Sequence, residues 1–261
     1  MTYASVARGY KGPGFNVGFA IGLPTVAPEY TTDVEVGIKG SYFDKHLLFN
    51  FSAFNETVKG FQAQSFDVAL TSYVIANAGE LKSRGFEMGA TGLLAQGLKA
   101  SLGLSYVDAY FASFAGDQCY VGQPASSCYV QPGASGPTSN STGNALPNAP
   151  RWSGTLSLEY RGHLTGQLDG KAALSEYARS RVNFSSNADP HTLQPGYGLT
   201  DASLALASGE DTWALTVFCR NCLDRRFVTY IEANPLVPTS YGQQFGINSF
   251  RTIGVSVEVR R

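Results

Sequence analysis

The sequence predicts an all-β protein, an antiparallel β-barrel that spans a membrane. Three observations support this prediction. Apolar and polar residues alternate with a period of two in about ten segments, as in strands with one apolar and one hydrophilic face. Most segments run for about 10 to 15 residues, longer than a usual soluble strand and long enough to cross a bilayer. The connections alternate between short and long, as they do in transmembrane barrels.

Composition agrees with this fold class. Charged residues make up 15% of the 261-residue chain, below the roughly 25% of an ordinary soluble domain. The net charge is −1, and proteins that bind nucleic acid usually carry a basic stripe, so we expect no nucleic-acid partner. No apolar run approaches the roughly 18 residues of a membrane-spanning helix, but the hydropathy of an alternating barrel strand averages out.

The first five strands are expected in the first half of the chain, at residues 2–10, 33–43, 47–62, 79–95 and 98–111. In the second of these, Val34, Val36 and Ile38 share one face and charged residues share the other. The fourth alternates less regularly. This pattern predicts strands whose apolar side meets either lipid or a second sheet.

The last five strands are expected at residues 151–162, 171–182, 199–208, 212–221 and 251–261. In the first of them, Leu156 and Leu158 alternate with polar residues. The closing strand has apolar residues at every second position from Ile253 to Val259. The count is even, so the first and last strands run in opposite directions.

The connections are sorted by length. Short ones are expected near residues 43–46, 96–97, 162–170 and 208–211, and long ones near 9–30, 62–72, 112–150, 183–197 and 231–249. The two residues Gln96 and Gly97 suit a tight hairpin whose second position needs a positive φ. A β-sandwich has no reason to place all its long loops at one end, so this sorting favours a barrel.

Aromatic residues gather near the expected strand ends. They are Tyr10, Tyr30, Tyr42, Phe43, Tyr110, Phe111, Trp152, Tyr160, Tyr197, Trp213 and Phe227. Such positions suit the two aromatic girdles of a membrane barrel. Aromatic residues that only cap a soluble core would be fewer beside polar loops.

Four cysteines form two close pairs. Cys119 and Cys128 bracket a polar stretch, and a disulfide there would imply an oxidising compartment and contribute about 3 kcal/mol; two free thiols are the alternative. Cys219 and Cys222 form a C-x-x-C pattern without βαβ surroundings, and they are too few for a structural zinc site. We therefore expect no redox or metal role for the second pair.

Several stretches, in order, resemble the C-terminal half of a TonB-dependent outer-membrane receptor. The closest is "YTTDVEVGIKGSYFDKHLLFNFSAFNETVKGFQ", followed by "NAGELKSRGFEMGATGLLAQGLKASLGLSYVDAYF" and "WALTVFCRNCLDRRFV". Cys222 stands where the last motif usually has leucine. The positions that match the family motifs are Glu35, Gly37, Lys39, Arg84, Gly85, Glu87, Asn221 and Asp224.

The resemblance implies a 22-stranded barrel plugged by a separate N-terminal domain. Residues 1–261 would supply about its last ten strands, with short periplasmic turns and long extracellular loops. The plug domain, the TonB box and a signal peptide have no counterpart in this sequence. The chain ends on Arg260 and Arg261 rather than on the aromatic residue usual in the family, so that either insertion is less efficient or the last residues extend past the membrane strand.

The resemblance also implies a function. The protein would lie in the outer membrane of a Gram-negative cell, contact its lipid, bind a ferric siderophore or similar ligand, and use the TonB complex through the missing N-terminal part. Candidate ligand contacts in the long loops are Phe15, Asn16, Tyr120, Tyr129, Tyr241 and Gln243. Loops that merely shield the pore are the alternative for each of them.

We expect no enzyme activity, cofactor or metal site. The sequence has neither a Gly-x-Ser-x-Gly elbow nor a phosphate-binding glycine loop. His46, His163 and His191 lie far apart in or near turns, which favours solvated side chains over metal ligands. Two other functions stay open: a passive porin-type channel and a soluble all-β binding module. A plug and TonB box upstream would favour the receptor, and an apolar face covered by a second sheet would favour the soluble module.

Overall fold

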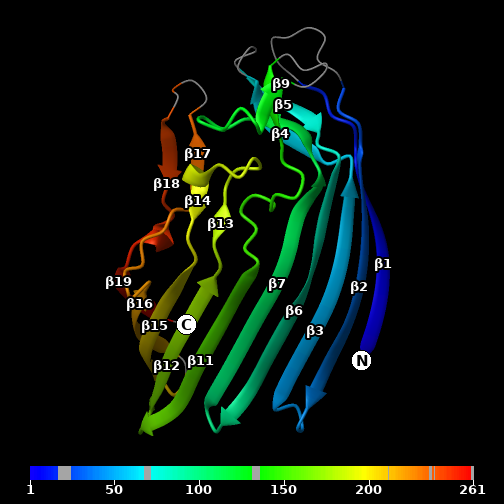
Figure 1. Ribbon diagram of the computed structural model, residues 1–261. Coiled ribbons are helices and arrows are strands. Elements are labelled where there is room, and N and C mark those ends of the chain that lie inside the picture. Colours follow the sequence, from blue (N-terminus) through cyan, green and yellow to red (C-terminus); the bar gives the residue numbers. More distant parts are fainter. Residues whose placement is uncertain are drawn as a thin grey trace.

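The computed structural model describes residues 1–16, 25–67, 72–130, 136–210, 212–234, 237 and 239–259. Ten long strands form one antiparallel sheet, which we call the wall (Figure 1). Its strands, in spatial and chain order, are β1 (Thr2–Lys11), β2 (Glu29–Tyr42), β3 (Leu47–Lys59), β6 (Glu80–Ala95), β7 (Leu98–Ser113), β11 (Trp152–Thr165), β12 (Leu168–Arg179), β15 (Tyr197–Ser208), β16 (Trp213–Arg220) and β19 (Thr252–Val259). The predicted all-β fold and each of the ten expected strands are confirmed.

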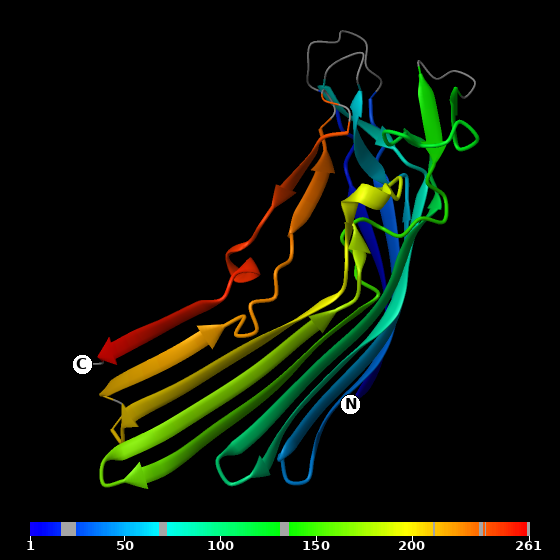
Figure 2. The ribbon, with the colours of Figure 1, turned by 60° about the vertical axis from the view of Figure 1, so that its left-hand side comes forward.

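The wall is a curved, open sheet. Each interior strand pairs with the one before and the one after it in the wall, so the chain runs up and down in an uninterrupted meander. Figure 2 shows the sheet bending into a trough. Strands β1 and β19 form its two edges and do not pair with each other among the described residues.

The strand register sorts side chains onto two faces. One row of cross-strand partners on the outward face is Leu204, Val217 and Val255, and a second is Leu206, Leu215 and Val257. On the opposite face, Ser157 and Ser175 are partners, with their hydroxyl oxygens 3.1 Å apart. The wall therefore has an apolar face and a polar face, as the alternation predicts.

The apolar face is uncovered. Leu204 is 67% exposed and Val257 is 69% exposed. The smaller sheets lie at one end of the wall (Figures 1 and 2), and the described residues form no second layer over this face. An apolar surface of this extent marks a contact with lipid or another molecule, so the arrangement is not that of a β-sandwich.

Short turns join the strands at one end of the wall. Gly97 has φ of +74°, and a Cβ atom there would collide with the carbonyl oxygen of Arg161. The connection expected at residues 162–170 is shorter than predicted, because β11 continues to Thr165 and β12 begins at Leu168. Gly162 and Gly170 are not turn residues; they pair with each other across the strands, and Leu164 fills the space beside Gly170.

The aromatic residues divide between the two faces. Tyr10 and Tyr30 are partners on the outward face with ring centroids 5.4 Å apart, and Trp152 and Tyr106 form another outward pair at 4.7 Å. Three residues predicted for the girdles are instead buried beneath loops or stacked on the inward side: Phe111, Tyr197 and Phe227. The girdle prediction is wrong for these three, because proximity to a strand end does not determine which face a side chain takes.

Five long connections leave the other end of the wall, and we call them the long loops. They comprise residues 12–28, 60–79, 114–151, 180–196 and 221–251. Four of them contain small elements that the sequence did not predict: β4 (Gln62–Asp67), β5 (Ser72–Asn77), β8 (Ala115–Gln118), β9 (Cys128–Val130), β10 (Pro137–Asn140), β13 (Val182–Asn183), η1 (Pro190–Thr192), β14 (Leu193–Gln194), β17 (Tyr230–Ala233), β18 (Tyr241–Gln244) and η2 (Ile247–Ser249). Most of these strands have only two to four residues, too few for a period of two to be recognisable. Among the described residues, no helix is both long and apolar enough to cross a membrane.

Two small hydrophobic clusters hold the long loops, one against the inner side of the wall and the other against each other. The first joins Val58, Leu81 and Phe111 of the wall to Ala78 and Phe114 of the loops. The second joins Val182, Phe184 and Ile231, which come from two different loops. The space between these clusters is where the candidate site lies.

Candidate ligand-binding site between the long loops

A cavity of about 630 Å³ lies between the long loops, and we call it the loop cavity. Four loops line it: the β3–β6, β7–β11, β12–β15 and β16–β19 connections. Phe61 and Phe111 line the cavity, and so do Phe184 and Ile231. Each pair belongs to one of the two hydrophobic clusters, so packing that anchors the loops also shapes the cavity.

Polar groups between the apolar walls are held by long-range hydrogen bonds. The hydroxyl of Ser141 donates to Asp117, which is buried, and Nδ2 of Asn187 donates to the carbonyl of Gln118 at 2.8 Å. Burial raises the pKa of Asp117, and the hydrogen bond from Ser141 opposes this shift. The first bond joins two segments of the β7–β11 loop, and the second fixes this loop against the β12–β15 loop at the cavity edge.

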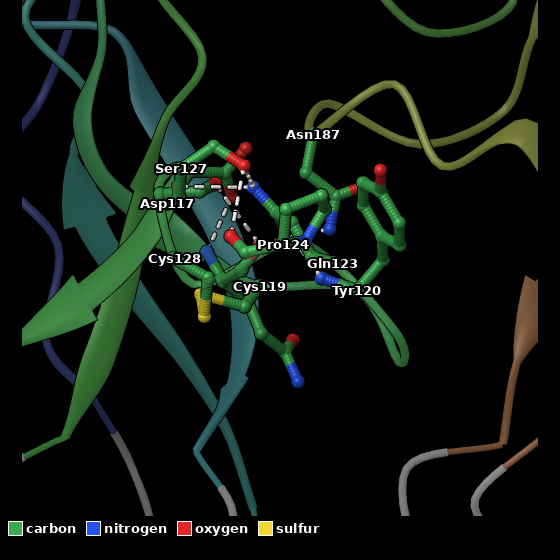
Figure 3. Close-up of a disulfide and its surroundings, with 10 residues drawn as sticks. Asp117, Cys119, Tyr120, Gln123, Pro124, Ser127, Cys128 and Asn187 are labelled. Atoms are coloured by element: carbon green, nitrogen blue, oxygen red, sulfur yellow. Dashed lines mark hydrogen bonds between the residues drawn. A yellow bond between two sulfur atoms is a disulfide. The ribbon is translucent and has the colours of Figure 1, made fainter.

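A disulfide closes the segment that follows Asp117 (Figure 3). Cys119 and Cys128 are bonded, with Cα atoms 5.8 Å apart, in the usual range for disulfides. Inside the segment, the carbonyl of Pro124 accepts from the backbone N–H groups of Ser127 at 2.9 Å and Cys128 at 3.0 Å. In Figure 3, Tyr120 and Asn187 lie on the side away from the sulfur atoms, and both line the loop cavity.

Asp189, His191 and Tyr241 tie the two loops on the other side of the cavity together. The phenol of Tyr241 donates to Asp189 at 2.8 Å, and Nδ1 of His191 lies 3.0 Å from the other oxygen of Asp189. Burial, and then the bond to Asp189, raises the pKa of Tyr241 to about 12. The cluster therefore fastens β18 to η1, and His191 belongs to it while staying largely exposed.

The six residues predicted to contact a ligand differ in where the structure places them. Tyr120 lines the loop cavity, and the other five do not. Phe15 is 70% exposed and Tyr129 is 50% exposed. Asn16 binds the backbone of Ile75 at 2.9 and 2.7 Å, which links the β1–β2 loop to β5. Tyr241 donates to Asp189, which itself lines the cavity, and Gln243 pairs with Ile231 in the β17–β18 hairpin.

Sequence reasoning missed several residues that do line the cavity. Among them are Asp117, Asn187 and Glu232. Asn187 meets Gln118 across 69 positions of sequence, so no local spacing could have placed the two together. Only the aromatic type of Tyr120 and its place in the longest loop gave a usable signal.

The family-motif positions have mainly architectural roles. Glu35, Gly37 and Lys39 lie on the inward face of β2, in register with Ser5, Tyr3 and the chain start. Arg84 faces outward and pairs with Asp108 at 3.1 Å. A Cβ atom at Gly85 would collide with the carbonyl oxygen of Tyr106, so this position needs glycine, and Glu87 faces inward like Gly85.

The last motif forms a clamp where β16 meets its loop. Asn221 is 1% exposed, and its Nδ2 donates to the carbonyls of Arg225 at 2.9 Å and Asn248 at 3.0 Å. Asp224 accepts from the backbone N–H of Arg251 at 3.1 Å, and this bond, with Arg226, lowers its pKa. Cys222, within this turn, is bonded to Cys219, with Cα atoms 5.5 Å apart. The clamp thus sets the start of the last long loop and the approach to β19.

Comparison with known proteins places these features in a family. A family model described as "TonB dependent receptor-like, beta-barrel" matches residues 1–222. The probable TonB-dependent siderophore receptor PiuA of Acinetobacter baumannii is 28% identical over 166 residues, which are 61% of this chain and 20% of that protein.

Solved structures share the fold. The ferric yersiniabactin uptake receptor FyuA from Yersinia pestis has a TM-score of 0.75 at 21% identity, covering 99% of this chain and 34% of that chain. The siderophore receptor PiuA from Acinetobacter baumannii has a TM-score of 0.68 at 22% identity, covering 98% and 33%. The copper transporter OprC has a TM-score of 0.62 at 16% identity, covering 98% and 36%. This chain spans about a third of the length of these solved relatives.

Proposed function

The chain belongs to the TonB dependent receptor-like β-barrel family, and we propose that it is the C-terminal part of an outer-membrane receptor that takes up a ferric siderophore. The observation that carries this proposal is the loop cavity. Its volume of about 630 Å³ suits a small chelate, and it opens between the long loops at the end of the wall where the family receives its ligand.

The proposal assigns the remaining parts of the receptor to sequence outside this chain. Relatives are about three times as long, which supports a missing plug domain and TonB box. Strands β1 and β19 would pair with further barrel strands, since an open sheet edge is not tolerated in hydrocarbon. The N-terminal part would contact the TonB complex, and ligand release inward would follow movement of the plug.

Location in the outer membrane of a Gram-negative cell is part of the same proposal. It is supported by the exposed apolar face of the wall, which fits an acyl-chain environment, and by the polar inward face, which fits a lumen. A soluble binding module has no use for an uncovered apolar face of this size. Family membership favours the receptor over a passive porin, and the proposal includes no catalytic residue or resident cofactor.

The cargo depends on the loops rather than on the wall. The copper transporter OprC shares the wall fold with siderophore receptors, so the strands alone do not select a ligand. The siderophore assignment is supported by PiuA, one of the relatives detected by sequence, together with the loop cavity.

An uptake assay tests the proposal. The intact receptor that contains this chain is deleted from an iron-limited strain, and uptake of radioactive iron is measured with a ferric siderophore as the sole iron source. We expect uptake to be lost on deletion, restored by the gene, and abolished when TonB is removed. Uptake that persists without TonB would support a passive channel, and uptake that is unaffected by the deletion would contradict the proposal.

A further inference from the structure

The charge of the loop cavity restricts the ligand that it accepts. Among the described residues that line it, none is lysine or arginine, whereas Asp117, Asp189 and Glu232 are carboxylates. Uncharged amides such as Gln62, Gln118 and Asn187 make up much of the remaining polar lining. A cavity with this lining offers hydrogen bonds but no cation to an incoming anion.

The sequence of the long loops extends this observation to every loop residue. The β1–β2 and β3–β6 loops contain no lysine or arginine. The other three loops carry arginine only close to a wall strand: Arg151 directly precedes β11, Arg181 shortly follows β12, Arg225 and Arg226 shortly follow β16, and Arg251 directly precedes β19. Two of these are already engaged, since Arg151 lies 3.4 Å from Asp108 and Arg226 lies 2.9 Å from Asp224.

Asp117 and Asp189 are buried, so Glu232 is the one of these three carboxylates that is exposed to a ligand. Asp117 accepts from Ser141, and Asp189 accepts from Tyr241. Glu232 is exposed on β17 at the cavity rim. A highly anionic ligand would therefore meet like charge at the rim and find no arginine or lysine in the lining, an arrangement that proteins use to reject a partner.

We propose that the loop cavity selects ferric chelates of zero or positive net charge, such as ferric trihydroxamates, and rejects trianionic ferric tris-catecholates. This inference rests on the proposed function as a siderophore receptor. Amide side chains fit the carbonyl and N–O groups of hydroxamates, and the rings of Phe61 and Tyr120 offer flat surfaces to the chelate backbone. A cleft of negative sign also raises the local concentration of a cationic chelate.

Binding of three probes to the intact receptor in detergent tests the inference. The probes are a neutral ferric trihydroxamate, a ferric trihydroxamate with a free ammonium group, and a ferric tris-catecholate of charge 3−. Affinities are measured by quenching of intrinsic fluorescence at low and moderate salt. We expect the trianion to bind at least about tenfold more weakly than the neutral probe, with the difference growing as salt is lowered.

A matched pair of charge reversals isolates the cavity. Glu232→Lys places a cation at the rim and should raise the affinity for the trianion by about tenfold while leaving the neutral probe unchanged. Glu210→Lys makes the same net-charge change in the β15–β16 turn at the opposite end of the wall and should have no effect.

The outcomes distinguish the two proposals. Tighter binding of the trianion than of the neutral probe, or equal effects of the two substitutions, would overturn the charge selection and leave the siderophore receptor standing. Failure of all three ferric chelates to bind would contradict the proposed function itself, and the inference would fall with it.

Discussion

The wall and the long loops are built by different kinds of interaction. In the wall, Leu204, Val217 and Val255 follow one another across strands in strict register, and each takes its face from the alternation of its own strand. In the loops, Asp117, Asn187 and Asp189 take their positions from partners on other segments. A repeated local pattern therefore determines the structure of the wall, whereas the structure around the loop cavity depends on a few specific bonds.

The largest effect is expected from substitutions that disrupt the apolar face of the wall. Leu204→Arg or Val257→Arg would place a charge on the lipid-facing side, which costs about 2–4 kcal/mol near the middle of a bilayer. We expect the intact receptor with either substitution to lose assembly, seen as loss of heat-modifiable migration on a gel. Ser203→Arg is the matched control, because the neighbouring residue faces inward, and it should assemble. Normal assembly of the Leu204 and Val257 variants would refute lipid contact on this face.

The next largest effect is expected from removing a disulfide in the β7–β11 loop, which should leave the wall intact. Cys119→Ser removes the bond to Cys128, and the loop-entropy relation predicts a local loss of about 3 kcal/mol. We expect faster protease cleavage within the β7–β11 loop and weaker ligand binding, with heat-modifiable migration unchanged.

Reduction provides the control for this disulfide. A thiol reductant should reproduce the loop cleavage in the wild-type protein and cause no further cleavage of the β7–β11 loop in a Cys119→Ser/Cys128→Ser double variant, which retains only the Cys219–Cys222 bond. Equal protease resistance of the wild type and the double variant would show that the bond does not order the loop.

The difference between the wall and the long loops explains how much of the structure can be predicted from the sequence. Ile253, Val255 and Val257 predict β19, because apolar side chains at every second position form a pattern that can be recognised in the sequence alone. The girdle prediction for Phe111 is wrong because Phe61 and Phe114, which come from two different loops, pack against its ring. Tyr120 was anticipated only by type, and Glu232 was not anticipated at all, because pairing of β17 with β18 places it at the cavity.

A smaller effect is expected at the junction of the wall and a loop. Asn221→Ala removes the amide that binds the carbonyls of Arg225 and Asn248 and leaves these groups unsatisfied, at a cost of about 1–3 kcal/mol. We expect a lower thermal unfolding temperature of the assembled receptor. Asn248→Ala keeps the backbone carbonyl that accepts the bond and is the matched control. An equal decrease in both variants would contradict the clamp.

The smallest effect is expected where two loops meet. Tyr241→Phe removes the hydroxyl that donates to Asp189, and one such bond contributes about 1 kcal/mol. We expect amide exchange in the β17–β18 hairpin to quicken about fivefold, which corresponds to that energy, while exchange in the wall is unchanged. Tyr129→Phe, on an exposed loop position, should leave the exchange of the hairpin as it is.

The pH dependence of the same contact sharpens the comparison. The pKa of Tyr241 is raised from 10.0 to about 12, so the folded loops favour the neutral phenol. A group whose folded pKa is raised contributes its full stability below the unfolded pKa and loses it as pH rises through the folded value. The difference in hairpin exchange between wild type and Tyr241→Phe should therefore be constant below pH 10 and vanish towards pH 12. A difference that persisted above this range would mean that the Tyr241 hydroxyl does not hold the two loops through Asp189.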